Sequence, residues 1–163
     1  MNEQFVLLED TRNQVGKHDL KHEYFGRKGI KVVRSKLPAG DYALLTNMQR
    51  LIDTKKGVSE AYQDLIQQHE RFRREADFCK DNGLLLIILI EDKYVRSLDD
   101  VEHWKSTHKR KKNDNRKPPV SGKQLQKVMR TFAERHGVKW VFCTPENAGR
   151  AIVYLLTGKD YGA

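Results

Sequence analysis

The chain has 163 residues, long enough for one domain whose hydrophobic core needs no disulfide or metal to stabilise it. Lys and Arg number 31 against 22 Asp and Glu, and the formal charge of +9 favours a polyanionic partner such as nucleic acid. The sequence has no signal-peptide pattern and no apolar run of about 18 residues, so we expect no membrane partner. We expect an intracellular protein, cytoplasmic if the source is microbial or viral and nuclear if it is eukaryotic.

The first third of the chain predicts four strands and one helix. Short apolar or alternating runs bounded by turn residues indicate strands at residues 5–8, 30–33, 42–46 and 50–55. A polar segment at residues 16–28, ended by Gly29, indicates a helix. The last two strands are close enough in sequence to form a hairpin, which would bring Asp41 near the face of the second strand.

The remainder predicts alternating helices and strands. Apolar residues at steps of three and four indicate one long helix over residues 58–81, with Ser59 as a candidate N-cap. The Leu/Ile run at residues 84–90 predicts a strand at the centre of a largely parallel sheet. A helix from Ser121 to Gly137, a strand at residues 138–143 and a last helix ending at Gly158 complete an α/β domain with a mixed sheet.

Residues 93–120 predict a flexible basic insertion. Their composition favours a loop, either a solvated insertion or an arm that grips phosphates when nucleic acid binds. The candidate DNA contacts are Lys109, Arg110, Lys111 and Lys112. Trp104 is either a stacking residue for nucleic acid or a local packing anchor.

Two short motifs carry the chemistry. Asp41 lies in Gly40-Asp41-Tyr42, and Asp53 and Lys55 are two residues apart on the next predicted strand, so they share one face. Two carboxylates can hold a divalent ion, and a lysine beside them can orient or activate a water molecule. Each motif alone is also common in a turn or on a solvated strand face.

Taken in order, these motifs resemble the nuclease domain of the XPF endonuclease family. That domain carries Asp-x-Arg-Glu, then Gly-Asp-Tyr, then Glu-Arg-Lys before a long helix. Asp10-Thr11-Arg12 is similar to the first motif, Gly40-Asp41-Tyr42 is the same as the second, and Asp53-Thr54-Lys55 follows the pattern of the third. The resemblance runs from about residue 5 to residue 157. It implies a restriction-endonuclease-like fold, a mixed central sheet flanked by helices in a single domain over residues 1–163.

The resemblance also implies an activity, a Mg²⁺- or Mn²⁺-dependent endonuclease for branched, flapped or forked DNA. Asp41, Asp53, the carbonyl of Thr54 and Asp10 would be the metal ligands, and Lys55 would position or deprotonate the attacking water. Arg12, Arg71 and Arg74 would contact DNA phosphates. Glu60 and Glu91 are possible partners of metal-bound water, and Glu60 is equally well explained as an acidic residue at a helix N-terminus.

The departures from the family pattern leave other functions open. Asn13 stands where the family has Glu, Asp53 replaces Glu, and Thr54 replaces Arg. A catalytically inactive DNA-binding module, or the partner subunit of a nuclease, is therefore an alternative, and a Holliday-junction resolvase is another. By analogy with the family, we expect a homodimer or heterodimer through this domain. The tandem helix-hairpin-helix domain that often follows in the family is not part of this sequence, and the basic insertion is expected to supply some of the DNA contact.

Overall fold

The computed structural model describes residues 4–106 and 120–163. The strands are β1 Val6–Glu9, β2 Lys31–Arg34, β3 Tyr42–Leu44, β4 Arg50–Lys56, β5 Leu85–Glu91 and β6 Lys139–Cys143. The α-helices are α1 Asp19–Arg27, α2 Gly57–Tyr62, α3 His69–Asp81, α4 Gly122–His136 and α5 Ala148–Thr157. Three shorter helical segments are η1 Gln63–Gln67, η2 Asp99–His103 and η3 Pro145–Asn147.

The strands form one six-stranded mixed sheet in the order β2-β1-β3-β4-β5-β6. β1 is parallel to β2 and antiparallel to β3, and β3 is antiparallel to β4. β4, β5 and β6 run parallel to one another. The expected mixed sheet and the internal position of β5 are therefore confirmed, and the continuous Leu/Ile composition of β5 follows from burial on both faces of the sheet.

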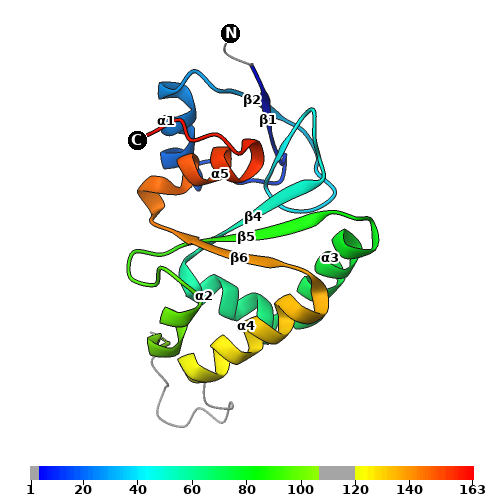
Figure 1. The fold of residues 1–163 in the computed structure, drawn as a ribbon, viewed down its shortest axis with the longest axis vertical. Helices are drawn as coiled ribbons and strands as arrows, with labels where there is room; N and C mark the ends of the chain where they lie inside the picture. Colours follow the sequence, from blue (N-terminus) through cyan, green and yellow to red (C-terminus); the bar gives the residue numbers. More distant parts are fainter. Residues whose placement is uncertain (1–3, 107–119) are drawn as a thin grey trace.

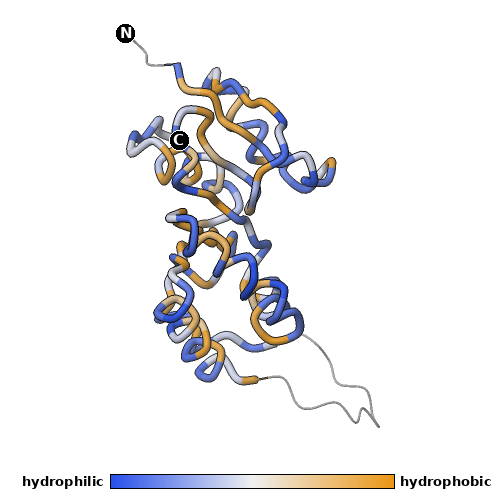
Figure 2. The backbone as a smooth tube through the Cα atoms, turned by 90° about the vertical axis from the view of Figure 1, so that its right-hand side faces the viewer, coloured by the Kyte–Doolittle hydropathy of each residue, from blue (hydrophilic) through white to orange (hydrophobic). Residues whose placement is uncertain are grey.

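Helices cover both faces of the sheet (Figure 1). α1 and α5 lie on one face, where Phe25, Tyr42 and Ile152 belong to one hydrophobic cluster. α2, α3 and α4 lie on the other face, where Phe72 and Phe132 belong to a second cluster. Figure 2 shows hydrophobic and hydrophilic stretches alternating along the outer helices, as expected for helices that pack only one face against the sheet.

The expectation of one long helix over residues 58–81 is wrong. α2 passes into the π-helical segment η1, and Gln68, with φ −120° and ψ 35°, separates η1 from α3. Ser59 is not the N-cap, because α2 begins at Gly57. Instead, the Asp92 carboxylate accepts a hydrogen bond of 3.1 Å from the Val58 N–H. The apolar residues spaced three and four apart nevertheless form one buried face, which includes Val58, Leu65 and Phe72. The break therefore interrupts the helix without changing which face packs on the sheet.

Residues 93–106 also differ from the expected loop. η2 forms there, and Val95 and Val101 are buried in the same cluster as α4. The Trp104 ring packs 5.6 Å from the Tyr62 ring, so the local anchor is the interpretation that the structure favours. Residues 107–119 of the predicted insertion, including Lys109–Lys112, lie outside the described residues.

Other boundaries follow the sequence closely. Ser121 and Gln124 form a capping box at the start of α4, and Gly137, with φ +72°, ends it as expected. β3 is shorter than predicted, and α1 begins at Asp19 rather than at residue 16. Among the described residues, no helix has the length and apolar character needed to cross a lipid bilayer.

Candidate active site

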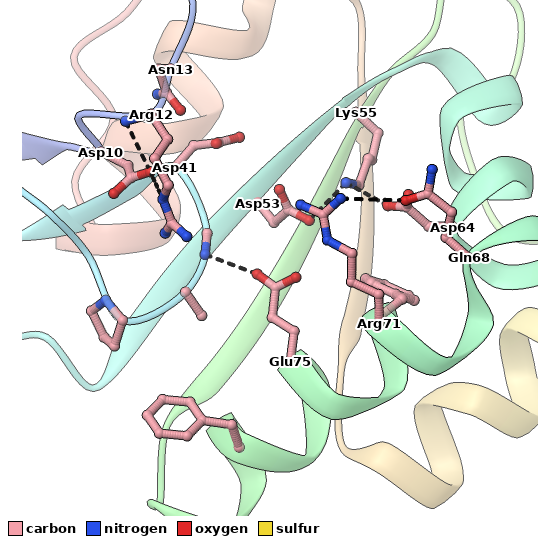
Figure 3. A pocket seen from close by; sticks show the side chains of 15 residues that line it. Asp10, Arg12, Asn13, Asp41, Asp53, Lys55, Asp64, Gln68, Arg71 and Glu75 are labelled. Atoms are coloured by element: carbon pink, nitrogen blue, oxygen red, sulfur yellow. Dashed lines mark hydrogen bonds and ion pairs between the residues drawn. The ribbon is translucent and has the colours of Figure 1, made fainter.

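A cleft of about 500 Å³ opens where β1 ends and β3 begins, between β4 and the helical segments η1 and α3. Figure 3 shows charged and polar side chains from these elements directed into it. The labelled lining residues are Asp10, Arg12, Asn13, Asp41, Asp53, Lys55, Asp64, Gln68, Arg71 and Glu75. The cleft therefore brings together Asp41, Asp53 and Lys55, which the sequence singled out, with acidic residues that it did not.

Asp41 is held against β4 by backbone and side-chain contacts. Gly40 has φ +71°, and a Cβ there would lie 2.9 Å from the Ile52 carbonyl oxygen, so only glycine fits without displacement. The Asp41 N–H donates to the Ile52 carbonyl at 2.7 Å. Its Oδ2 accepts hydrogen bonds from the Thr54 N–H at 2.8 Å and from Thr54 Oγ1 at 2.6 Å. These contacts fix the carboxylate beside Asp53.

Asp10 is buried at the end of β1 with both carboxylate oxygens engaged. Oδ2 accepts from Arg12 Nε at 2.6 Å, and Oδ1 accepts from the Leu37 N–H at 2.8 Å. Burial acts to raise the pKa of Asp10, but these hydrogen bonds outweigh it and hold the pKa below its ordinary value. Arg12 also donates to the Leu37 carbonyl at 3.1 Å. The pair therefore orients an arginine at the cleft wall.

Lys55 lies between two carboxylates inside the cleft. Its Nζ is 3.0 Å from Asp53 Oδ2 and 2.5 Å from Asp64 Oδ2. Burial lowers the pKa of Lys55, but the two carboxylates raise it by more, so the net direction is upward. Lys55 is therefore a protonated cation at neutral pH. Of the two roles considered for it, this charge favours positioning over proton abstraction.

Asp53 is a buried carboxylate in a negatively charged environment. Burial raises its pKa, Lys55 opposes the shift, and Asp41 and Glu75 add to it, giving a pKa of about 8. The Oδ2 atom is buried with no hydrogen-bond partner among the described residues beyond its ion pair with Lys55 Nζ at 3.0 Å. An unsatisfied carboxylate oxygen among like charges fits an additional cation.

The structure describes no ready-made metal centre. Within residues 4–106 and 120–163, no three His, Cys, Asp or Glu side chains converge closely enough to hold a metal ion as they stand. The donor set lining the cleft is nevertheless made of carboxylates, the ligands that hard divalent cations prefer. The cleft therefore fits a divalent cation by the chemistry of its carboxylates and by the buried Asp53 Oδ2, which has no hydrogen-bond partner among the described residues.

The sequence reasoning missed two acidic residues of the cleft, Asp64 and Glu75. Glu75 Oε1 accepts a hydrogen bond of 3.1 Å from the Gly40 N–H, which ties α3 to the turn before Asp41. A signal for Glu75 existed, because it follows Arg71 by four residues and so shares its helix face. The same signal existed for Asp64, because it precedes Arg71 by seven residues, which is about two turns of the predicted helix.

Glu60 and Glu91 lie on the other side of the same carboxylates, in a depression that Asp41, Asp53 and Lys55 also line. Glu60 Oε2 accepts from the Lys56 N–H at 2.8 Å, and Glu91 is buried with Lys21, whose Nζ lies 2.8 Å from Glu91 Oε2. Both acids line a smaller neighbouring depression of about 250 Å³ rather than the main cleft. Arg71 lines the main cleft, whereas Arg74 lies outside it and donates to the Glu70 carbonyl at 3.4 Å.

The fold and the acidic cleft define a restriction-endonuclease-like domain, and comparison with known proteins gives its family. A model of the ERCC4 domain matches residues 10–156, and the chain therefore belongs to the ERCC4 domain family. The resemblance that the motifs of Asp10, Asp41 and Asp53 suggested is confirmed as membership of this domain family. A search of curated protein sequences gives no match.

Two solved structures share the fold. XPF from Aeropyrum pernix superposes with a TM-score of 0.63 at 16% sequence identity, over 92% of this chain and 59% of that one. XPF from Aeropyrum pernix in complex with DNA gives a TM-score of 0.62 at 16% identity, over 93% of this chain and 62% of that one. This chain thus spans about three fifths of the length of those XPF chains, with coverages of 59% and 62%.

Proposed function

We propose that this protein is a divalent-metal-dependent, structure-specific endonuclease that hydrolyses phosphodiester bonds in branched, flapped or forked DNA. The observation that carries the proposal is the convergence of Asp41, Asp53 and Lys55 in one cleft, with Asp53 Oδ2 buried and lacking a hydrogen-bond donor. Membership of the ERCC4 domain family and the net charge of +9 support DNA as the substrate.

Asp41 and Asp53 are the residues that would hold Mg²⁺ or Mn²⁺, with the carbonyl of Thr54 as a further oxygen ligand. When bound, such an ion polarises the phosphate and lowers the pKa of a coordinated water. Asp10 would contribute through water, because Arg12 and Leu37 already engage its oxygens. Its more direct effect is to orient Arg12.

The cationic side chains would act on the phosphate itself. Lys55, protonated and anchored by Asp64, would donate a hydrogen bond to the attacked phosphate as negative charge develops on it. Arg12 and Arg71 line the same cleft, and each has the planar geometry for a bidentate phosphate contact. Within the part of the chain that the structure describes, Arg71 makes one long hydrogen bond, of 3.5 Å to Gln68 Oε1, and its other N–H groups are available for DNA.

The test is cleavage of labelled flap, fork, four-way-junction and plain duplex DNA with Mg²⁺, Mn²⁺ or EDTA. The wild type is expected to cut branched substrates only with metal. Asp41→Ala and Lys55→Ala are each expected to lose cleavage while retaining most DNA binding. Asp99→Ala is the matched control, because Asp99 pairs with Arg130 outside the cleft. Wild-type cutting by either site variant would overturn the assignment of the site.

A DNA-binding module without catalysis is the second candidate. Two observations favour it: Asn13 replaces the family's Glu, and no three acidic, His or Cys side chains among the described residues converge as a metal centre. Tight binding of branched DNA without cutting under any metal would support this candidate. A Holliday-junction resolvase would instead make paired, symmetric nicks on the four-way junction.

The expected dimer remains a proposal. The last helix, α5, exposes 55% of Tyr154 while its other face packs on the sheet. Light scattering of the purified chain, and of an equimolar mixture with a candidate partner subunit, separates a homodimer from a heterodimer.

A further inference from the structure

The cleft extends past the carboxylates to an apolar end. Phe78 and Pro38 line it there, on α3 and on the turn before β3. Both residues are exposed, and Phe78 leaves 44% of its surface accessible. The proposed hydrolysis uses neither residue.

Packing does not account for the position of Phe78. The other apolar residues of α3, namely Phe72, Ala76 and Cys79, are buried in the core. Phe78 belongs to neither hydrophobic cluster, and among the described residues no aromatic ring stacks on it. Large exposed aromatic side chains that line a polar cleft are typical of binding surfaces.

α3 presents a cation, an anion and an aromatic ring to the cleft in that order. Arg71, Glu75 and Phe78 are spaced four and three residues apart, so they share one helix face. Figure 3 shows Arg71 and Glu75 directed from α3 toward the carboxylates of the sheet. At about 1.5 Å of rise per residue, Phe78 lies roughly 10 Å along the helix from Arg71.

The order of these three side chains determines which ligand fits the outer end of the cleft. Arg71 attracts a phosphate, whereas the Glu75 carboxylate, held in place by the Gly40 N–H, repels a second phosphate beside it. Beyond Glu75 on α3, the residue that lines the cleft is the uncharged Phe78, with Pro38 and Ala39 lining it from the turn before β3. A nucleobase matches this end of the cleft, because every base has an uncharged aromatic face that stacks on Phe.

We propose that the outer end of the cleft binds an unpaired nucleobase next to the cleaved bond, stacked on Phe78. The inference rests on the proposed function, since it assumes a DNA strand whose phosphate lies at Arg71. In a duplex each base is stacked and paired inside the helix, so only an unpaired nucleotide can reach this surface without prior melting. Phe78 thereby supplies a physical reason for discrimination between branched and fully paired DNA.

The experiment pairs Phe78 variants with a fork whose unpaired nucleotides beside the junction are normal, abasic or 2-aminopurine. Loss of one base–aromatic stack weakens binding by about 5- to 150-fold. We expect that loss for Phe78→Ala on the normal fork, and retention of binding for Phe78→Trp. We expect the wild type to lose as much affinity on the abasic fork that lacks the stacked base. On that fork, Phe78→Ala should bind no more weakly than the wild type. Tyr94→Ala is the control, because Tyr94 is 82% exposed and outside the cleft.

Affinity for every fork is measured in EDTA by fluorescence anisotropy of an end label, and stacking on Phe78 is measured by quenching of 2-aminopurine in the fork that carries it. Thermal melting verifies that each variant is folded. Equal binding of wild type and Phe78→Ala to the normal fork would overturn the proposal. So would a Phe78→Ala variant that loses as much affinity on every abasic fork as on the normal fork. If the wild type cuts DNA but Phe78→Ala does not change affinity for the forks, this inference fails and the nuclease proposal stands. If no cutting occurs but Phe78-dependent quenching persists, the nuclease proposal fails and the base-binding surface stands.

Discussion

The Lys55 ammonium lies 2.5 Å from the Asp64 carboxylate, and the π-helical segment η1 carries Asp64. Single π-helical turns occur frequently at functional sites, where they redirect a side chain. Asp64 therefore acts on the proposed chemistry through Lys55 and is a positioning residue.

Asp64→Asn is expected to lower kcat by about tenfold or more, with DNA affinity nearly unchanged, because Lys55 loses one of its two anchors. The Asp64 carboxylate also raises the pKa of Lys55, so the alkaline limb of the pH–rate profile should move to lower pH. Asp64→Glu should restore part of the rate. A fall in kcat without any change in the pH profile would indicate a purely structural role.

Removal of the Asp53 charge should stabilise the metal-free protein at neutral and alkaline pH. The pKa of Asp53 is about 8 in the folded protein against an ordinary value of 3.8, so between these values the folded state holds a proton that the unfolded chain releases. This contribution to stability is full below the ordinary pKa and is lost as pH rises toward the folded pKa. In EDTA, the Tm of Asp53→Asn minus that of wild type should thus increase from pH 5 to pH 8.

A pKa of about 8 for Asp53 corresponds to a loss of roughly 3–4 kcal/mol of stability between pH 5 and pH 8. Because 1 kcal/mol shifts Tm by about 2–4 °C in a protein of this length, the change should be on the order of 10 °C. Mg²⁺ should raise the Tm of the wild type and leave that of Asp53→Asn nearly unchanged. A Tm difference that stays constant across this pH range would contradict the raised pKa. Differential scanning calorimetry in matched buffers measures both effects.

Gly40→Ala should both unfold more easily and lose activity. The new Cβ would lie 2.9 Å from the Ile52 carbonyl oxygen, and the residue would have to keep φ +71°. Strain of this kind costs about 1–3 kcal/mol, and relief of it would move Asp41. Gly26→Ala is the matched control, since Gly26 lies in α1 with no atom within 4 Å of the added Cβ. Urea denaturation should show a loss for the first variant and no loss for the second.

The basic run outside the described residues should contribute to DNA affinity through charge alone. Each phosphate contact contributes about 0.9 to the slope of log K against log salt on duplex DNA. Replacement of Lys109, Arg110, Lys111 and Lys112 by Ala should therefore reduce that slope, by at most about 3.6 if all four contact phosphates. An unchanged slope would show that the run is a solvated insertion.

The sequence by itself determined the strand and helix pattern that local chemistry controls. The apolar run of β5 predicted a buried parallel strand, and Ser121 and Gly137 predicted the ends of α4. The period of two along β4 placed Asp53 and Lys55 on one face, and the order of the three motifs indicated the family. These signals depend on residues close together in the chain, so they are readable without coordinates.

The tertiary structure decided what surrounds those residues. The fold placed Asp64 on η1 beside Lys55 on β4, and the contact between Glu75 and Gly40 joined α3 to the turn before β3, although the partners are 9 and 35 residues apart. The protonation of Lys55 and the raised pKa of Asp53 depend on burial and on charges from several elements. Electrostatic interactions act through space, and only the packed fold sets those distances.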